Sequence, residues 1–176
     1  TVSVVIPARN EKGNIQALVQ RTPRMGKSTE IIFVEGNSTD DTWQEIQRIG
    51  ELYKEERPLK WIQQEGKGKG DAVRKGYSIA TGDILMILDA DMTVPPEDLP
   101  KFFQAIASGK GEYINGTRLV YPMEKEAMRT LNLLGNKFFS LAFSWLLGQR
   151  LKDTLCGTKV MTRENYLKLS ANRAYF

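Results

Sequence analysis

Histidine is absent from the 176-residue chain, and Cys156 is its only cysteine. The lack of histidine excludes Ser-His-Asp triads and HExxH zinc sites, and a single thiol excludes an intrachain disulfide and Cys/His zinc clusters. Catalysis must therefore rely on carboxylates, Lys, Arg, hydroxyl groups or a hard metal ion. A single thiol also fits a reducing compartment, so we expect a cytoplasmic location.

Long apolar runs and the familiar nucleotide-binding glycine patterns are missing as well. No stretch approaches the roughly 18 apolar residues of a membrane span, and no signal peptide precedes the first expected strand. The patterns G-x-x-x-x-G-K-[ST] and G-x-G-x-x-G are both absent, which argues against P-loop NTPases and dinucleotide-dependent dehydrogenases. Because the chain begins at Thr1 directly on an expected strand, we expect a domain excised from a longer protein.

The composition describes one folded domain with a modest positive charge. Hydrophobic residues make up 41% of the chain and charged residues 26%, enough for a single core over residues 1–176. The formal net charge is +4, but basic residues cluster only within 67–75, without interleaved aromatics. Nucleic acid is therefore not an expected partner, and a compact anion such as a phosphate fits better.

Strand and helix patterns alternate along the chain. β-branched and apolar runs predict strands at 2–6, 30–34, 59–62, 84–88, 113–116 and 158–161. Helical spacing predicts helices at 11–21, after 38–41, at 71–80, from 95 onward and within an amphipathic region at 124–147. This order predicts an α/β fold with a doubly wound, mostly parallel sheet and helices on both faces, in a single domain. Ligands of such folds bind beyond the carboxyl ends of the strands.

Two carboxylates follow the most apolar strand, as Asp89-Ala90-Asp91. Residues two apart at a strand end project to the same side, so both carboxylates can face one cation. Carboxylate oxygens with room for substrate phosphates suit Mg²⁺ or Mn²⁺. The alternative is that this acidic pair only caps a turn.

A glycine-rich loop, Gly66-Lys67-Gly68-Lys69-Gly70, precedes the third expected helix. Backbone N–H groups at a helix N-terminus and two ammonium groups can together bind a diphosphate. A solvated loop without a ligand is the alternative.

Several segments, in order, resemble the family-two inverting glycosyltransferases of the GT-A fold, and more narrowly the branch of dolichyl-phosphate glucose or mannose synthases. The matching segments are Val4 to Glu11, Val34 to Thr42, Ala80 to Asp83, Leu88 to Asp91, Gly116 to Arg118 and Asp153 to Lys159. The chain departs from the branch in two places. Gly36 and Asn37 stand where a second acidic residue is usual, which leaves UDP and GDP both open, and Thr158 replaces a phenylalanine.

The resemblance implies a donor part at about 1–108 and an acceptor part at about 109–176. It places Asp89 near the donor ribose and sugar, and Asp91 on the metal, and makes both catalytic. The donor-binding residues are expected to be Pro7, Ala8, Arg9, Asn10, Glu11, Glu35, Asn37, Lys67, Lys69, Asp71, Asp89 and Ala90. Arg118, Arg129 and Lys159 are expected on the acceptor phosphate, although the two arginines could equally form surface ion pairs.

The implied reaction is a single displacement at the anomeric carbon, with inversion, from a nucleoside diphosphate sugar to a polyprenyl phosphate. A phosphate nucleophile is already anionic and needs no strong base. If the acceptor is a sugar hydroxyl, a carboxylate must take its proton, and Asp153 is the candidate. The Leu- and Phe-rich stretch 131–147 fits either the core or a peripheral contact with a membrane, at its cytoplasmic face.

Other functions stay open at this point. A transferase acting on a sugar hydroxyl in cell-surface polysaccharide synthesis and a non-catalytic nucleotide-sugar sensor both fit the same donor residues. A sugar nucleotidyltransferase fits less well, since residues 7–11 lack the glycine-rich, basic loop expected there. The oligomeric state is not predicted.

Overall fold

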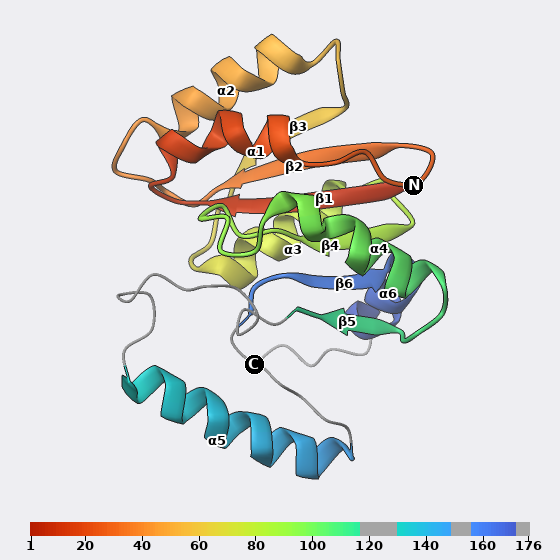
Figure 1. Ribbon diagram of the computed structural model, residues 1–176. Helices are drawn as coiled ribbons and strands as arrows, with labels where there is room; N and C mark the ends of the chain where they lie inside the picture. Colours follow the sequence, from red (N-terminus) through yellow and green to blue (C-terminus); the bar gives the residue numbers. More distant parts are fainter. Residues whose placement is uncertain (117–129, 149–155, 172–176) are drawn as a thin grey trace.

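The computed structural model describes residues 1–116, 130–148 and 156–171, which include a six-stranded sheet in the order β3-β2-β1-β4-β6-β5 (Figure 1). The strands are β1 (Val2–Ala8), β2 (Thr29–Glu35), β3 (Leu59–Gln63), β4 (Ile84–Ile87), β5 (Tyr113–Asn115) and β6 (Lys159–Thr162). The helices are α1 (Ile15–Arg21), α2 (Thr42–Tyr53), α3 (Lys69–Ile79), α4 (Leu99–Ala107), α5 (Thr130–Leu147) and α6 (Arg163–Ala171). Short 3-10 turns at Lys12–Asn14 and Pro96–Asp98 precede α1 and α4.

Most neighbouring strands of the sheet are parallel, as the sequence predicts. β1 pairs in parallel with β2 and β4, and β2 with β3. Only β6 runs antiparallel to its neighbours, between β4 and β5. The strand order reverses beside β1, so the loops after β1 and β4 diverge at the point where doubly wound folds bind ligands.

Alternating side chains of the central strands build two cores. Val4 and Ile6 of β1 face the side covered by α1, α2 and α4, while Val5 faces the side covered by α3. Tyr166 of α6 packs on the second side, edge-on against Tyr77 of α3, with ring centroids 4.8 Å apart. The prediction of helices on both faces is confirmed.

Helix α5 lies apart from the sheet and the helices that cover it (Figure 1). Among the residues whose exposure is described, Phe138, Phe139, Leu141 and Leu146 are exposed, and Trp145 is 86% exposed. No helix within the described part of the chain is long and apolar enough to cross a membrane.

The segment Ala80 to Asp83, part of the family resemblance, lies at the amino-terminal edge of the sheet. The hydroxyl of Ser3 donates a 2.5 Å hydrogen bond to Glu30, and the backbone N–H of Thr81 donates one of 2.6 Å. The ammonium of Lys60 lies 2.7 Å from the same buried carboxylate. A Cβ on Gly82 would lie 2.6 Å from the backbone nitrogen of Ser3, so the turn has no room for a side chain there. This segment therefore stabilises the fold.

We expect Glu30→Gln to lower the free energy of unfolding by about 1.5–3 kcal/mol at pH 7. Burial acts to raise the pKa of Glu30, but the bonds from Lys60, Ser3 and Thr81 outweigh it and lower the pKa below its usual value. A carboxylate with a lowered pKa stabilises the fold above its unfolded pKa, and that stability is lost as the pH falls through the folded pKa. The difference in the free energy of unfolding between the wild type and Glu30→Gln should therefore become smaller below about pH 4.

Urea unfolding at pH 7 and at pH 3 measures this difference. Glu65→Gln is the matched control, because Glu65 pairs with Lys75 but its side chain is 86% exposed. An equal loss for Glu30→Gln at both pH values would contradict the assigned role of its charge.

Candidate active site

A pocket of about 270 Å³ opens beyond the carboxyl ends of β1, β2 and β4. Its lining comes from the ends of β1 and β2, from the loops after β1, β2, β3 and β4, and from the first turn of α3. The lining residues are Pro7, Ala8, Arg9, Glu11, Val34, Gly36, Gln64, Gly68, Lys69, Ala72, Asp89, Ala90 and Asp91. The pocket thus lies at the reversal of strand order beside β1.

The loops after β1 and β2 are bound to each other by Asn10. Its backbone N–H donates to the hydroxyl of Ser38 (3.0 Å), and its side-chain oxygen accepts from the N–H of Thr39 (2.8 Å). Asn10 has a positive φ of 57°, which asparagine tolerates better than most residues. Gly36 donates its N–H to the carbonyl of Ala8 at 2.9 Å, which holds the two loops close together.

Glu35 is buried beneath these loops. Its carboxylate accepts hydrogen bonds from the N–H of Ser38 (2.6 Å) and the amide of Gln63 (3.0 Å). Burial acts to raise the pKa of Glu35, yet these bonds outweigh it and the pKa is lowered. Glu35 is therefore a charged residue that shapes the loop and does not line the pocket.

The glycine-rich loop leads directly into α3. Gly68, with a positive φ of 82°, occupies the N-cap position, and Lys69 begins the helix. The ammonium of Lys69 forms an ion pair with Asp89 inside the pocket. Asp71 accepts the N–H of Gly66 at 3.0 Å, so its carboxylate closes the loop instead of facing the pocket.

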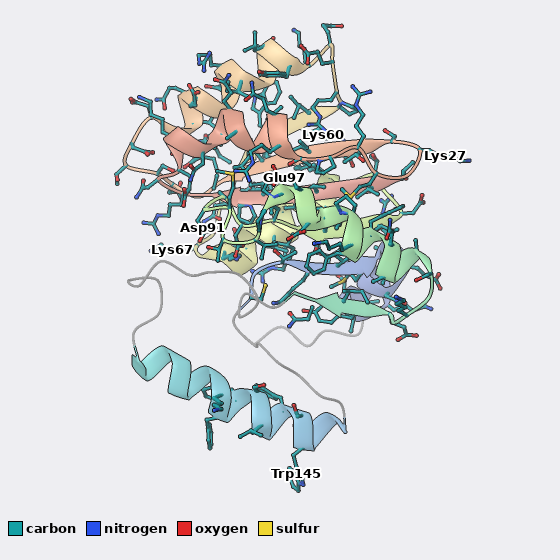
Figure 2. All side chains as sticks on the ribbon, in the orientation of Figure 1. Lys27, Lys60, Lys67, Asp91, Glu97 and Trp145 are labelled. Atoms are coloured by element: carbon teal, nitrogen blue, oxygen red, sulfur yellow. The ribbon has the colours of Figure 1, made fainter. Side chains whose placement is uncertain are left out.

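Asp89 and Asp91 occupy a tight turn after β4. The N–H of Met92 donates to the carbonyl of Asp89 (3.1 Å), and Asp91 accepts the N–H of Thr93 through one carboxylate oxygen (2.9 Å). Asp91 is exposed at the pocket rim, at the same edge of the molecule as Lys67 (Figure 2).

Glu11 adds a third carboxylate to the pocket. Burial raises the pKa of Glu11, the hydrogen bond from Asn14 opposes this, and the charges of Asp91 and Asp89 raise it further. Negative charge therefore accumulates here, which favours a cation. Within the described residues no three Asp, Glu, Cys or His side chains are arranged to hold a metal ion. The carboxylate oxygens of Asp89 and Asp91 are the kind of ligand that Mg²⁺ or Mn²⁺ prefers, and such an ion would take its remaining ligands from phosphates and water.

The structure brings many of the predicted donor residues together, and leaves others outside the lining. Those that line the pocket are Pro7, Ala8, Arg9, Glu11, Lys69, Asp89 and Ala90, and Asp91, the expected metal ligand, lines it as well. Those that do not are Asn10, Glu35, Asn37, Lys67 and Asp71. Their part in donor binding stays a prediction.

The predicted acceptor residues fall in two groups. Arg118, Arg129 and Asp153 lie outside the described residues. Lys159 begins β6, where its ammonium donates to the side-chain oxygen of Asn115 (3.2 Å) and to the carbonyl of Cys156. It lines a second, mainly apolar pocket of about 240 Å³ that also contains Tyr77 and Tyr166.

Gln64 is a pocket residue that the sequence analysis missed. It is buried directly after β3, where its N–H donates to the carbonyl of Glu35 (2.9 Å) and its amide to that of Gly66 (3.1 Å). Ligands of doubly wound folds bind beyond the carboxyl ends of the strands. Gln64 directly follows the third expected strand, so the same rule predicts a pocket residue there.

A mostly parallel sheet with helices on both faces, and with a helix N-terminus and a carboxylate pair at its switch point, defines a doubly wound α/β domain. A family model, Glycosyl transferase family 2, matches residues 3–169. The chain belongs to this family.

Curated relatives are similar over part of the chain. Dolichol-phosphate mannosyltransferase of Pyrococcus furiosus is 38% identical over 122 residues, covering 68% of this chain and 33% of the relative. The Saccharomyces cerevisiae protein of the same name is 37% identical, covering 59% of this chain and 40% of the relative. Undecaprenyl-phosphate 4-deoxy-4-formamido-L-arabinose transferase of Pectobacterium carotovorum is 30% identical, covering 76% and 42%. The chain thus spans less than half the length of these three relatives.

Solved structures share the fold. Glucosyl-3-phosphoglycerate synthase of Mycobacterium tuberculosis, with Mn²⁺, UDP-glucose and phosphoglyceric acid, superposes with a TM-score of 0.70 at 22% identity. It covers 93% of this chain and 57% of the other. The mannosyltransferase PcManGT of Pyrobaculum calidifontis, with GDP-Man and Mn²⁺, gives a TM-score of 0.65 at 20% identity, covering 96% and 46%.

Proposed function

We propose that this domain catalyses metal-dependent transfer of a hexose from a nucleoside diphosphate sugar to a polyprenyl phosphate. The observation that carries the proposal is the pocket that joins Lys69 at the start of α3 to Asp89 and Asp91 at the strand-order reversal. Family membership and relatives named for transfer to dolichol or undecaprenyl phosphate support the acceptor class.

The donor diphosphate is assigned to the first turn of α3. Backbone N–H groups at a helix N-terminus favour anions, and Lys69 adds a full positive charge beside them. Ala90 lies between the two aspartates, and although it is buried it contributes to the lining of the pocket, on the side that we assign to the ribose or sugar. We assign the nucleoside to the loops after β1 and β2, whose close approach Asn10 and Gly36 maintain.

Asp91, assisted by Asp89, is assigned to Mg²⁺ or Mn²⁺. A bound divalent ion supplies positive charge to the diphosphate as it leaves the sugar. Structures in the same fold class hold Mn²⁺ with UDP-glucose or GDP-Man, which supports a divalent ion and leaves the choice between the two metals to experiment.

The acceptor oxygen attacks the anomeric carbon opposite the departing diphosphate, so the configuration at that carbon inverts. A phosphate oxygen carries its own negative charge, and the chain, which has no histidine, need not supply a strong base. We assign Arg118, Arg129 and Lys159 to the acceptor phosphate, because Arg and Lys side chains form charge-assisted hydrogen bonds with phosphate oxygens.

The exposed apolar side chains of α5 are assigned to a membrane surface at the cytoplasmic face. A polyprenyl acceptor resides in a bilayer, and an interfacial helix buries such side chains at the headgroup boundary. Trp145 points away from the rest of the molecule (Figure 2).

Transfer assays test the proposal directly. The intact protein is incubated with labelled UDP-glucose or GDP-mannose, Mn²⁺ or Mg²⁺, and either polyprenyl phosphate in detergent or a soluble saccharide. We expect label to move to the lipid phosphate only with a divalent metal. Transfer to the saccharide alone would favour the sugar-hydroxyl alternative, and nucleotide binding without transfer to any acceptor would indicate a sensor.

We expect Lys69→Ala to weaken nucleoside diphosphate binding about 10- to 100-fold, the loss of one charge-assisted contact. Binding of the bare nucleoside should change little, and the loss should shrink as salt rises. Lys27→Ala is the matched control, because Lys27 is exposed just before β2, at the opposite edge of the sheet, and does not line the pocket. Calorimetry measures both. Equal losses for nucleoside and diphosphate would show that Lys69 does not bind phosphate.

A further inference from the structure

The antiparallel pairing of β4 and β6 brings a glycine to the first aspartate of the Asp-Ala-Asp motif. Ile87 pairs with Lys159 at the end of the ladder. Continuing the same register two residues further places Asp89 opposite Gly157. Directly opposed residues of antiparallel strands have Cβ positions about 4.5–5.5 Å apart, so whatever stands at 157 faces the Asp89 side chain.

Gly157 leaves the space that the Asp89 carboxylate occupies. A Cβ built on Gly157 would lie 1.8 Å from Oδ2 of Asp89 and 2.3 Å from its carboxyl carbon. On its other oxygen, Asp89 forms the ion pair with Lys69. The carboxylate is therefore held between a cation on one side and a bare backbone on the other.

The segment that carries Gly157 and leads into β6 has little freedom to move away from Asp89. Cys156 is buried, and a Cβ on Gly116 would lie 2.8 Å from its sulfur. Gly116 donates its N–H to the carbonyl of Thr158 at 2.9 Å, and Lys159 donates to the carbonyl of Cys156. Bonds on both sides of Gly157 thus fix its backbone, while the Asp89 side chain can rotate about its own bonds.

The geometry points to Gly157 as a positioning residue: its missing side chain keeps Asp89 directed into the metal and donor pocket. A methyl group there moves the carboxylate, because rotating the Asp89 side chain costs less than displacing backbone that is hydrogen-bonded on both sides of Gly157. The displaced carboxylate then weakens its ion pair with Lys69 and binds a metal ion less well, while the fold changes little. This inference rests on the proposed function in that it assigns the Asp89 carboxylate to metal-dependent donor binding.

Gly157→Ala in the intact protein tests it by calorimetry with UDP and with GDP, each with and without Mn²⁺. We expect Mn²⁺-dependent nucleotide affinity to fall about 10- to 100-fold, the usual effect of disturbing a group that orients a metal ligand. The melting temperature should change by only a few degrees. Gly116→Ala is the matched control, because it crowds the same Cys156 without touching Asp89. It should lower the melting temperature and leave the affinity of the folded protein unchanged.

A double-mutant cycle on thermal stability separates the contact from the function. In an Asp89→Ala background the Cβ at 157 meets no carboxylate, so Gly157→Ala should cost less stability there than in the wild type. Equal costs in both backgrounds, or wild-type Mn²⁺-dependent affinity in Gly157→Ala, would overturn the inference. If the wild-type protein binds nucleotide with Mn²⁺ and transfers no sugar, the proposed function fails, and the affinity ratio between variant and wild type still decides the role of Gly157.

Discussion

Asp91→Asn should abolish most of the Mn²⁺-dependent affinity for UDP or GDP and leave the protein folded. Asp91 is exposed at the pocket rim, where its carboxylate accepts a hydrogen bond from the N–H of Thr93, and an amide oxygen can accept the same bond. The fold therefore loses little. A divalent ion held by few protein oxygens loses an anionic ligand, so we expect at least a 100-fold weaker metal-dependent component, about 2.7 kcal/mol.

Calorimetry with and without Mn²⁺ isolates that component, and the melting temperature monitors the fold. Asp41→Asn is the matched control, because Asp41 follows β2 at the same edge of the sheet, pairs with Lys12 and does not line the pocket. It removes the same charge without removing a proposed ligand. Unchanged Mn²⁺-dependent affinity in Asp91→Asn would remove the metal assignment.

Asp153→Asn should lower turnover on the order of 100-fold while donor affinity stays within about twofold of the wild type. Asp153 lies outside the described residues, and the prediction rests on its place three residues before Cys156, whose neighbour Gly157 contacts Asp89. A carboxylate on the acceptor side stabilises positive charge that develops at the anomeric carbon. It also takes the proton when the acceptor is a hydroxyl, so the loss should be larger with a saccharide acceptor.

Turnover is measured with polyprenyl phosphate in detergent, and donor affinity by calorimetry. Asp91→Asn is the contrasting variant, because its main defect should be weaker metal-dependent donor binding, whereas Asp153→Asn should keep donor affinity and lose turnover. A group that acts mainly in the transition state changes kcat and spares donor binding. Normal turnover together with normal donor affinity would exclude Asp153 from the active site. Lower stability with normal turnover per folded molecule would identify a turn or helix-capping aspartate.

Much of the fold could be predicted because its central strands are buried on both faces. Continuous apolar runs marked β1, β2 and β4 to within about two residues of their observed bounds. The helix expected at 11–21 begins instead with a 3-10 turn, so regular α1 is shorter. The spacing of apolar residues predicts α1 correctly. The 3-10 turn before it has no such apolar spacing, so the sequence does not indicate it.

The far side of the sheet was harder to predict. α6 was not predicted, because none of its residues is buried and its apolar side chains follow no clear helical period. The position of β6 between β4 and β5 was also not predicted. Pairing over such a sequence separation depends on tertiary packing, which spacing along one chain does not specify.

Within the site, sequence reasoning identified the loops better than it identified the contacts within them. Asp71 and Glu35 belong to the expected segments, yet their carboxylates bind backbone N–H groups of their own loops. Lys67 and Lys69 look equivalent in sequence, and only Lys69 reaches Asp89. Which polar side chain satisfies the loop and which faces the ligand depends on three-dimensional geometry.

The register of β6 limits which changes in length the domain tolerates. Because successive residues of a strand face opposite sides, a shift of β6 by one residue exchanges its two faces. Buried Val160 would leave the core, and Cys156 or Thr158 would bring a side chain to the place of Gly157. An insertion or deletion within β6 therefore disturbs both the core and the pocket that Asp89 and Asp91 line. Variants of this chain that differ in length should therefore tolerate insertions and deletions in the loops, and should keep the number of residues from Gly157 through β6 unchanged.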